Sequence, residues 1–179
     1  MKTRHFNTIS LCLLVILSLL TSCSGYNTQM RKHLSDEANY HPYRGMICDV
    51  YYFDEEGGKV SLLQRNEIPQ RPVVLELAFD DLETVRTFLG GEPDPERMPD
   101  EYRFSFYITE DNSRILADHG FYTFVSVNTP VEIMASSYIY MDTDFFWIAA
   151  VTCDERTCLP FDDGLQNIRD YMNEHKSLT

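Results

Sequence analysis

The sequence of 179 residues lacks the short motifs typical of enzymes and nucleotide-binding proteins. It contains no dinucleotide fingerprint, no P-loop, no G-x-S-x-G nucleophile motif and no H-E-x-x-H zinc motif. A D-x-D-x-D-G calcium loop is also missing. Histidine is scarce, and His119 is the only one between residues 42 and 174. Because Asp118 and Gly120 flank it, we interpret it as a turn residue. We therefore expect no catalytic residues, no metal site and no cofactor.

Basic residues are in deficit. The chain has 15 Lys and Arg against 28 Asp and Glu, which gives a net charge of −13 at pH 7. A strongly acidic chain repels the phosphates of nucleic acids and anionic lipid head groups, so nucleic-acid binding is excluded. The same charge favours a basic protein partner. The plainer alternative is that the charge serves solubility alone.

A hydrophobic run long enough to span a bilayer is also missing. The longest apolar stretch, residues 9–20, has about a dozen residues, whereas a spanning helix needs about 20. It follows the basic residues Lys2 and Arg4. A basic start followed by a short apolar run is typical of a secretory signal peptide.

The end of this run resembles the lipobox of bacterial lipoproteins. Leu20, Thr21, Ser22 and Cys23 supply an aliphatic residue, two small residues and the cysteine, in that order. The resemblance implies that residues 1–22 are a cleaved signal peptide and that lipid on Cys23 holds the chain at a membrane of the cell envelope. Ser24 rather than Asp favours the outer membrane, facing the periplasm, in a Gram-negative host; in a Gram-positive host the location is the outer face of the cell membrane. The alternative is an ordinary signal peptide with a chance cysteine.

The remaining 157 residues suffice for one domain of ordinary size. Their charge is −15, because the signal segment removes two basic residues and no acids. Residues 23–45 are polar with weak periodicity, so we interpret them as the lipidated N-terminus and a flexible tether, with a helical turn around Met30 and Leu34. Residues 46–179 form the predicted single β-rich domain.

Alternating apolar residues predict several strands in this domain. We expect a hairpin from 46–53 and 60–64, then strands at 73–79, 102–109, 121–127, 131–141 and 145–152. Asp80 and Glu83 have the spacing of a capping box before a short helix, and Gly90 ends it. Leu165, Ile168 and Met172 predict a C-terminal amphipathic helix. The predicted fold class is α+β: a mainly antiparallel sheet or sandwich with one short internal helix and a C-terminal helix.

Three cysteines lie in the predicted domain: Cys48, Cys153 and Cys158. Disulfides persist in exported proteins, and three thiols allow three pairings, each with one thiol left over. The local pair Cys153–Cys158 is the first candidate. It would be a structural disulfide joining the last strand to the C-terminal helix, with Cys48 as an extra thiol.

The segment from Cys153 to Pro160 also resembles part of the N-terminal periplasmic domain of DsbD-type thiol:disulfide interchange proteins. In that immunoglobulin-like domain a short polar loop separates a cysteine pair, and a proline follows. The resemblance implies a redox role for Cys153 and Cys158. It covers about ten residues, has one proline where the family commonly has two, and lacks the polytopic electron-carrying segment.

Three functions from different classes follow from the sequence. The first is a non-catalytic, membrane-anchored lipoprotein that binds a basic protein, of which a toxin-neutralising immunity protein is one version. The second is a thiol–disulfide accessory protein that uses Cys153 and Cys158. The third is a structural protein of envelope assembly.

Overall fold

The described residues fold into one continuous sheet of seven strands with helices on its outside. The computed structural model describes residues 28–66, 69–137 and 145–175. The strands are β1 His41–Phe53, β2 Lys59–Ser61, β3 Val73–Phe79, β4 Arg103–Ile108, β5 Pro130–Ser136, β6 Phe145–Cys153 and β7 Arg156–Leu159. The helices are α2 Leu82–Leu89, α3 Glu110–Asp118, α4 Phe121–Phe124 and α5 Phe161–Glu174, besides a helix over residues 28–34 and the short 3₁₀ turns η1 Glu37–Asn39 and η2 Pro99–Glu101.

Five of the strands close into a barrel in the order β1-β3-β4-β6-β5, because β5 also pairs with β1. All neighbouring pairs in the barrel are antiparallel except β4–β6. Strand β2 pairs antiparallel with the end of β1, and β7 pairs antiparallel with the end of β6. The circular order, the parallel pair and a helix between β4 and β5 are those of the five-stranded Greek-key barrel known as the OB fold. The predicted α+β class with a mainly antiparallel sheet is confirmed, and the sheet closes as a barrel rather than a sandwich.

Strand β1 pairs with β3 along one edge and with both β5 and β2 along the other, because it bends in the middle. Gly45 crosses β3 so closely that a β-carbon there would lie 2.5 Å from the carbonyl oxygen of Ala78. The register on β3 then slips between Ile47 and Asp49, which leaves Cys48 as the extra residue of a β-bulge. A bulge bends and twists its strand. The first half of β1 can therefore pair with β5 while the second half pairs with β2.

Two hydrophobic cores lie on opposite sides of the barrel wall. The barrel interior is packed with aromatic and aliphatic side chains, including Phe79, Phe88, Phe106 and Phe146. A second core lies outside β6, where Trp147 and Ala149 meet α5 and the helix over residues 28–34. Strand β6 is thus apolar on both faces, as predicted for a central strand.

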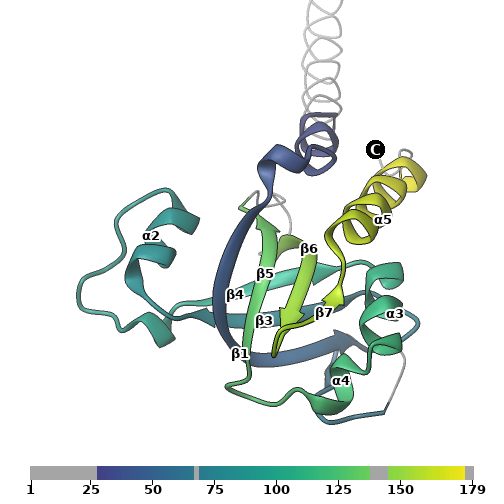
Figure 1. The fold of residues 1–179 in the computed structure, drawn as a ribbon, viewed down its shortest axis with the longest axis horizontal. Helices are drawn as coiled ribbons and strands as arrows, with labels where there is room; N and C mark the ends of the chain where they lie inside the picture. The colour runs from purple at the N-terminus through teal and green to yellow at the C-terminus, as the bar shows by residue number, and fades with distance from the viewer. Residues whose placement is uncertain (1–27, 67–68, 138–144, 176–179) are drawn as a thin grey trace, which may run out of the picture.

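The prediction of a flexible tether up to residue 45 is wrong for residues 28–45. Met30 and Leu34 are buried in the second core. Arg31 donates a hydrogen bond to the His175 carbonyl (2.9 Å), and Arg169 donates one to the Ser35 carbonyl (2.9 Å). Residues 41–45 then belong to β1. Figure 1 shows this N-terminal helix beside α5, at the same end of the molecule.

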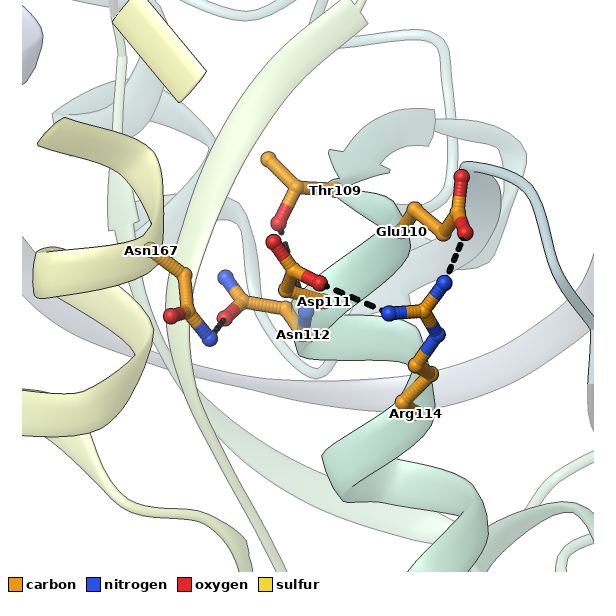
Figure 2. A network of polar contacts seen from close by, with 6 residues as sticks. All are labelled: Thr109, Glu110, Asp111, Asn112, Arg114 and Asn167. Carbon is orange, nitrogen blue, oxygen red and sulfur yellow. Dashed lines mark hydrogen bonds and ion pairs between the residues drawn. The ribbon is translucent and has the colours of Figure 1, made fainter. Parts of the chain in front are cut away.

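Helix α5 packs onto β6 through a glycine and is joined to α3 by two asparagines. A β-carbon at Gly164 would overlap the carbonyl group of Ala149 in β6, so only glycine permits this approach. The buried Asn112 of α3 donates to the Gly164 carbonyl (3.1 Å) and accepts a hydrogen bond from Asn167 of α5 (2.8 Å). Figure 2 shows the two amides facing each other, while Arg114 reaches its own acidic neighbours on α3. This polar network holds the helices in place.

Four elements differ from the prediction. The strand expected at 121–127 is wrong, because Phe121–Phe124 form the helical turn α4. Helix α3 and strand β7 were not predicted, so the fold has more than one internal helix. The cap of α2 is Asp81 rather than Asp80, and its carboxylate accepts a hydrogen bond from the Thr84 amide at 2.7 Å. The end of the strand expected at 131–141 and the turn expected at 142–144 lie outside the described residues.

Candidate functional site

The predicted cysteine pair lies in the tight hairpin between β6 and β7. Asp154 and Glu155 form its two-residue turn with φ values of 50° and 61°. Two successive residues in the left-handed region form a type I′ turn, whose twist matches that of the two strands of a hairpin. Cys153 pairs with Arg156 across the hairpin. Cys158 falls where the register slips, so it is opposite no residue of β6. Both side chains point into the barrel core.

Cys153 and Cys158 are free thiols in the structure. Each donates to a backbone carbonyl, Cys153 to Pro130 (3.5 Å) and Cys158 to Arg156 (3.6 Å). Burial, the nearby Asp154 carboxylate and the second thiol raise the pKa of Cys153 to about 11. Burial also raises the pKa of Cys158. Because the thiolate is the reactive form, this environment opposes thiol exchange. The disulfide between the two residues stays a prediction.

The third cysteine, Cys48, has a different environment. As the bulge residue of β1 it points to the outside of the barrel and is half-buried. Burial raises the pKa of its thiol, and Arg103 opposes that shift. Cys48 lines a surface groove, so it is a more accessible thiol than the two in the hairpin.

A depression with acidic walls lies between the first half of β1 and the start of α2. Its volume is about 720 Å³, and it is lined by Pro42, Tyr43, Arg44, Asp80, Asp81, Glu83, Thr84, Thr87 and Glu132. Arg44 is its one basic group, and Glu132 holds it in an ion pair at 2.9 Å. Asp81 is engaged in capping α2, and the hydrogen bonds from Thr84 lower the pKa of its carboxyl group. Asp80 and Glu83 are left facing solvent without an ion pair among the described residues.

An apolar groove adjoins this depression. We define the methionine groove by its exposed apolar side chains Met46, Met98 and Val127. Its volume is about 570 Å³, within the range of ordinary ligand pockets. Five large hydrophobic side chains are exposed in the described part of the chain, and three of them line this groove. Asp80 lines both cavities, so the acidic depression and the groove are neighbours.

Neither cavity is predicted by the sequence. Their residues come from β1, the end of β3, α2, the loop before β4, and β5 with the segment before it, and barrel closure brings these together. One local signal was available: Met98 is a large apolar residue in a loop otherwise rich in proline and acidic residues.

Several predicted features receive no test from the structure or have only a local role. Cys23 and the signal segment 1–22 lie outside the described residues. His119 is an exposed C-cap of α3, followed by Gly120 in the left-handed conformation, as predicted for a turn residue. Within 28–66, 69–137 and 145–175, no group of three or more His, Cys, Asp or Glu residues is placed to hold a metal ion. None of the described helices is long and apolar enough to cross a bilayer.

The outer side of β3 and β4, which OB barrels use to bind oligonucleotides and oligosaccharides, is occupied by internal contacts here. Glu76 pairs with Arg103 at 3.3 Å. Tyr107 packs on Trp147 and reaches the hydroxyl of Tyr171 in α5 at 3.4 Å. Burial by α5 raises the pKa of Tyr107, so its hydroxyl stays protonated. The face therefore offers neither free cations nor exposed rings for a nucleic acid.

No protein-family model, no curated protein and no solved structure matches this chain. The OB arrangement accordingly rests on the strand order, the strand directions and the helix between β4 and β5. The local resemblance of Cys153–Pro160 to the DsbD-type domain does not extend to the fold, because that domain is immunoglobulin-like and this chain forms a closed barrel.

Proposed function

We propose that this protein is a lipid-anchored, extracytoplasmic binding module that recognises a basic protein and catalyses no reaction. The observation that carries the proposal is the acidic depression beside α2. Four carboxylates line it, its one arginine is already paired, and Asp80 and Glu83 face solvent. Unpaired carboxylates in a concave site concentrate positive charge, which favours the approach of a basic partner.

The anchor is proposed from the lipobox. Cys23 follows two small residues and a short apolar run, and the basic residues Lys2 and Arg4 precede that run. Lipid on Cys23 would hold the barrel at an envelope membrane, on its periplasmic or outer face. The net charge of −15 keeps the barrel from adhering to anionic head groups, which leaves its acidic depression available to protein partners.

The alternative of a thiol–disulfide accessory protein has weaker support. Exchange requires an accessible sulfur with a lowered pKa. Cys153 and Cys158 are buried in the core, and their pKa values are raised. A structural role in envelope assembly remains the third candidate, and it predicts partners that are retained regardless of charge.

Capture of partners from the envelope of the native host tests the proposal. The tagged chain and two charge-matched variants are incubated with detergent-solubilised envelope, and retained proteins are identified by mass spectrometry. The first variant, Asp80→Asn with Glu83→Gln, removes two charges from the depression. The control, Glu55→Gln with Glu56→Gln, removes two charges from the exposed turn between β1 and β2.

We expect the parent chain and the turn control to retain the same basic protein. We expect its recovery to fall at least tenfold with the depression variant, and to fall again when salt rises from about 50 to about 300 mM. Equal recovery with both variants, or retention that is independent of salt, refutes recognition through the acidic depression.

A further inference from the structure

We infer that the methionine groove and the adjoining Asp80 together bind a segment of the partner in which an apolar side chain lies next to lysine or arginine. This inference rests on the proposed function and adds the chemistry of the recognised segment. It assigns the apolar side chain to the groove and the cation to the carboxylates at its edge.

The apolar part of the inference rests on exposure that the fold itself does not require. Met98 is 63 % exposed, Val127 is 54 % exposed and Met46 is 38 % exposed, although each lines the same concavity. A side chain that docks there would take these apolar surfaces out of water. Methionine side chains are flexible and polarisable, so they adapt to differently shaped apolar partners. Buried apolar anchors of this kind dominate the affinity of protein interfaces.

The groove also has carboxylates that no cation of the described residues neutralises. Arg103 lines the groove, but Glu76 holds it in an ion pair. Asp80 and Asp100 line the same groove, and neither belongs to an ion pair among the described residues. Asp80 also lies at the boundary with the acidic depression. A cation next to the apolar anchor would therefore meet carboxylates on two sides.

Charge complementarity selects this occupant over the others that an apolar groove can take. A second copy of this chain carries the same net charge of −15, so it would be repelled. Anionic lipids and nucleic acids are disfavoured for the same reason. A basic protein segment is attracted, and an apolar residue within it fills the groove.

Binding of three synthetic nonapeptides to the chain from residue 23 onward, with Cys23→Ser, provides the test. The first peptide alternates lysine and leucine, the second alternates lysine and serine, and the third alternates glutamate and leucine. Each carries a fluorophore, and the change in anisotropy reports binding. We expect the lysine–leucine peptide to bind at least tenfold more tightly than either of the others.

Two lysine substitutions separate the groove from general electrostatics. Met98→Lys and Leu89→Lys each replace an exposed apolar residue by a cation, but Leu89, which is 48 % exposed, lies outside the groove. We expect Met98→Lys to weaken the lysine–leucine peptide at least tenfold and Leu89→Lys to weaken it less than threefold. Equal losses, or equal binding of the lysine–leucine and lysine–serine peptides, refute the inference.

Cys48 provides a second readout, because it lines the groove while Cys153 and Cys158 are buried. We expect a saturating amount of the lysine–leucine peptide to slow alkylation of Cys48 at least fivefold. An unchanged rate would overturn the placement of the peptide in the groove. If envelope capture succeeds while these peptide tests fail, the proposed function stands without this inference. If capture also fails, both are refuted.

Discussion

The contact between α5 and β6 leads to a sharp prediction about Gly164. Substitution Gly164→Ala adds a methyl group that would lie 2.8 Å from the carbonyl carbon of Ala149 and overlap its oxygen. Carbon atoms pack comfortably at 3.5–4.0 Å, so α5 would have to retreat by about 1 Å. That movement would also stretch the hydrogen bond from Asn112 to the Gly164 carbonyl.

One stabilising and two destabilising terms decide the magnitude of this change. Alanine is a better helix former than glycine and would stabilise a helix interior by about 1 kcal/mol. Overpacking typically costs about 1–3 kcal/mol, and here the clash is with backbone rather than with a flexible side chain. A lengthened hydrogen bond to a buried amide adds about 1 kcal/mol. We expect Gly164→Ala to lower the free energy of unfolding by about 2 kcal/mol.

Urea denaturation followed by circular dichroism measures this change. With a slope of about 2 kcal/mol per molar urea, the midpoint should fall by about 1 M. The matched control is Gly91→Ala, because a β-carbon at Gly91 would meet no atom within 4 Å. It should shift the midpoint by less than about 0.3 M. A Gly164→Ala variant as stable as the parent chain would refute the close helix–strand approach.

Four further results are expected. Cys23→Ser should abolish incorporation of an alkyne fatty acid in cells, and label retained by the mutant would refute the lipid anchor. Asn112→Ala should lower the free energy of unfolding by about 1–3 kcal/mol in the same urea assay, because it removes the hydrogen bond to the Gly164 carbonyl and leaves the Asn167 amide without its acceptor; an unchanged midpoint would contradict the network in Figure 2. Burial raises the pKa of the Cys153 thiol to about 11, so this thiol stays protonated in the folded state at pH values where it ionises in the unfolded state. The free energy of unfolding should therefore be unaffected below about pH 9 and fall as the pH rises from 9 to 11, and it should fall less steeply in Cys153→Ala. Identical pH profiles of the two proteins would contradict the burial of this thiol. If Cys153 and Cys158 form the predicted disulfide in the exported protein, its reduction potential should lie below about −300 mV, and ready reduction by a thioredoxin-type donor would place the redox function first.

The sequence predicts best those elements whose burial pattern is regular. The strand at residues 73–79 is confirmed to the residue, because its alternation follows the two sides of the barrel wall. The apolar strand near Trp147 is confirmed because it is buried on both faces, and the C-terminal helix is confirmed because Leu165, Ile168 and Met172 are buried at helical spacing. The hairpin between β1 and β2 is also confirmed, and its turn has the expected glycine.

The errors have physical causes that recur at particular residues. Helix α3 buries Asn112 and Ser113, which satisfy polar partners in the core, so its amphipathic pattern is disguised. Phe121 and Tyr122 favour a strand by composition, but the left-handed Gly120 before them starts a helical turn. The β6–β7 turn has Glu155 at its second position, where glycine is usual, so the local sequence does not predict the hairpin that contains β7.

The candidate site was beyond sequence reasoning for a different reason. Met46, Met98 and Val127 are far apart in the chain, and none belongs to a recognisable motif. Their proximity depends on barrel closure, which brings β1 beside both β3 and β5. The negative charge of the site was easier to predict from the sequence, because the excess of acidic residues already favoured a basic partner. Its position at the start of α2 required the structure.

The packed helix over residues 28–34 has a consequence for how far this protein could reach. Only four residues separate Cys23 from Thr28, so the chain between them spans at most about 18 Å when fully extended. With lipid on Cys23, as we propose, the barrel would be held close to the membrane with its α5 end toward the bilayer. The barrel would then meet partners only close to the membrane surface. Its effective concentration would be high for membrane-bound proteins and low for proteins free in the surrounding fluid.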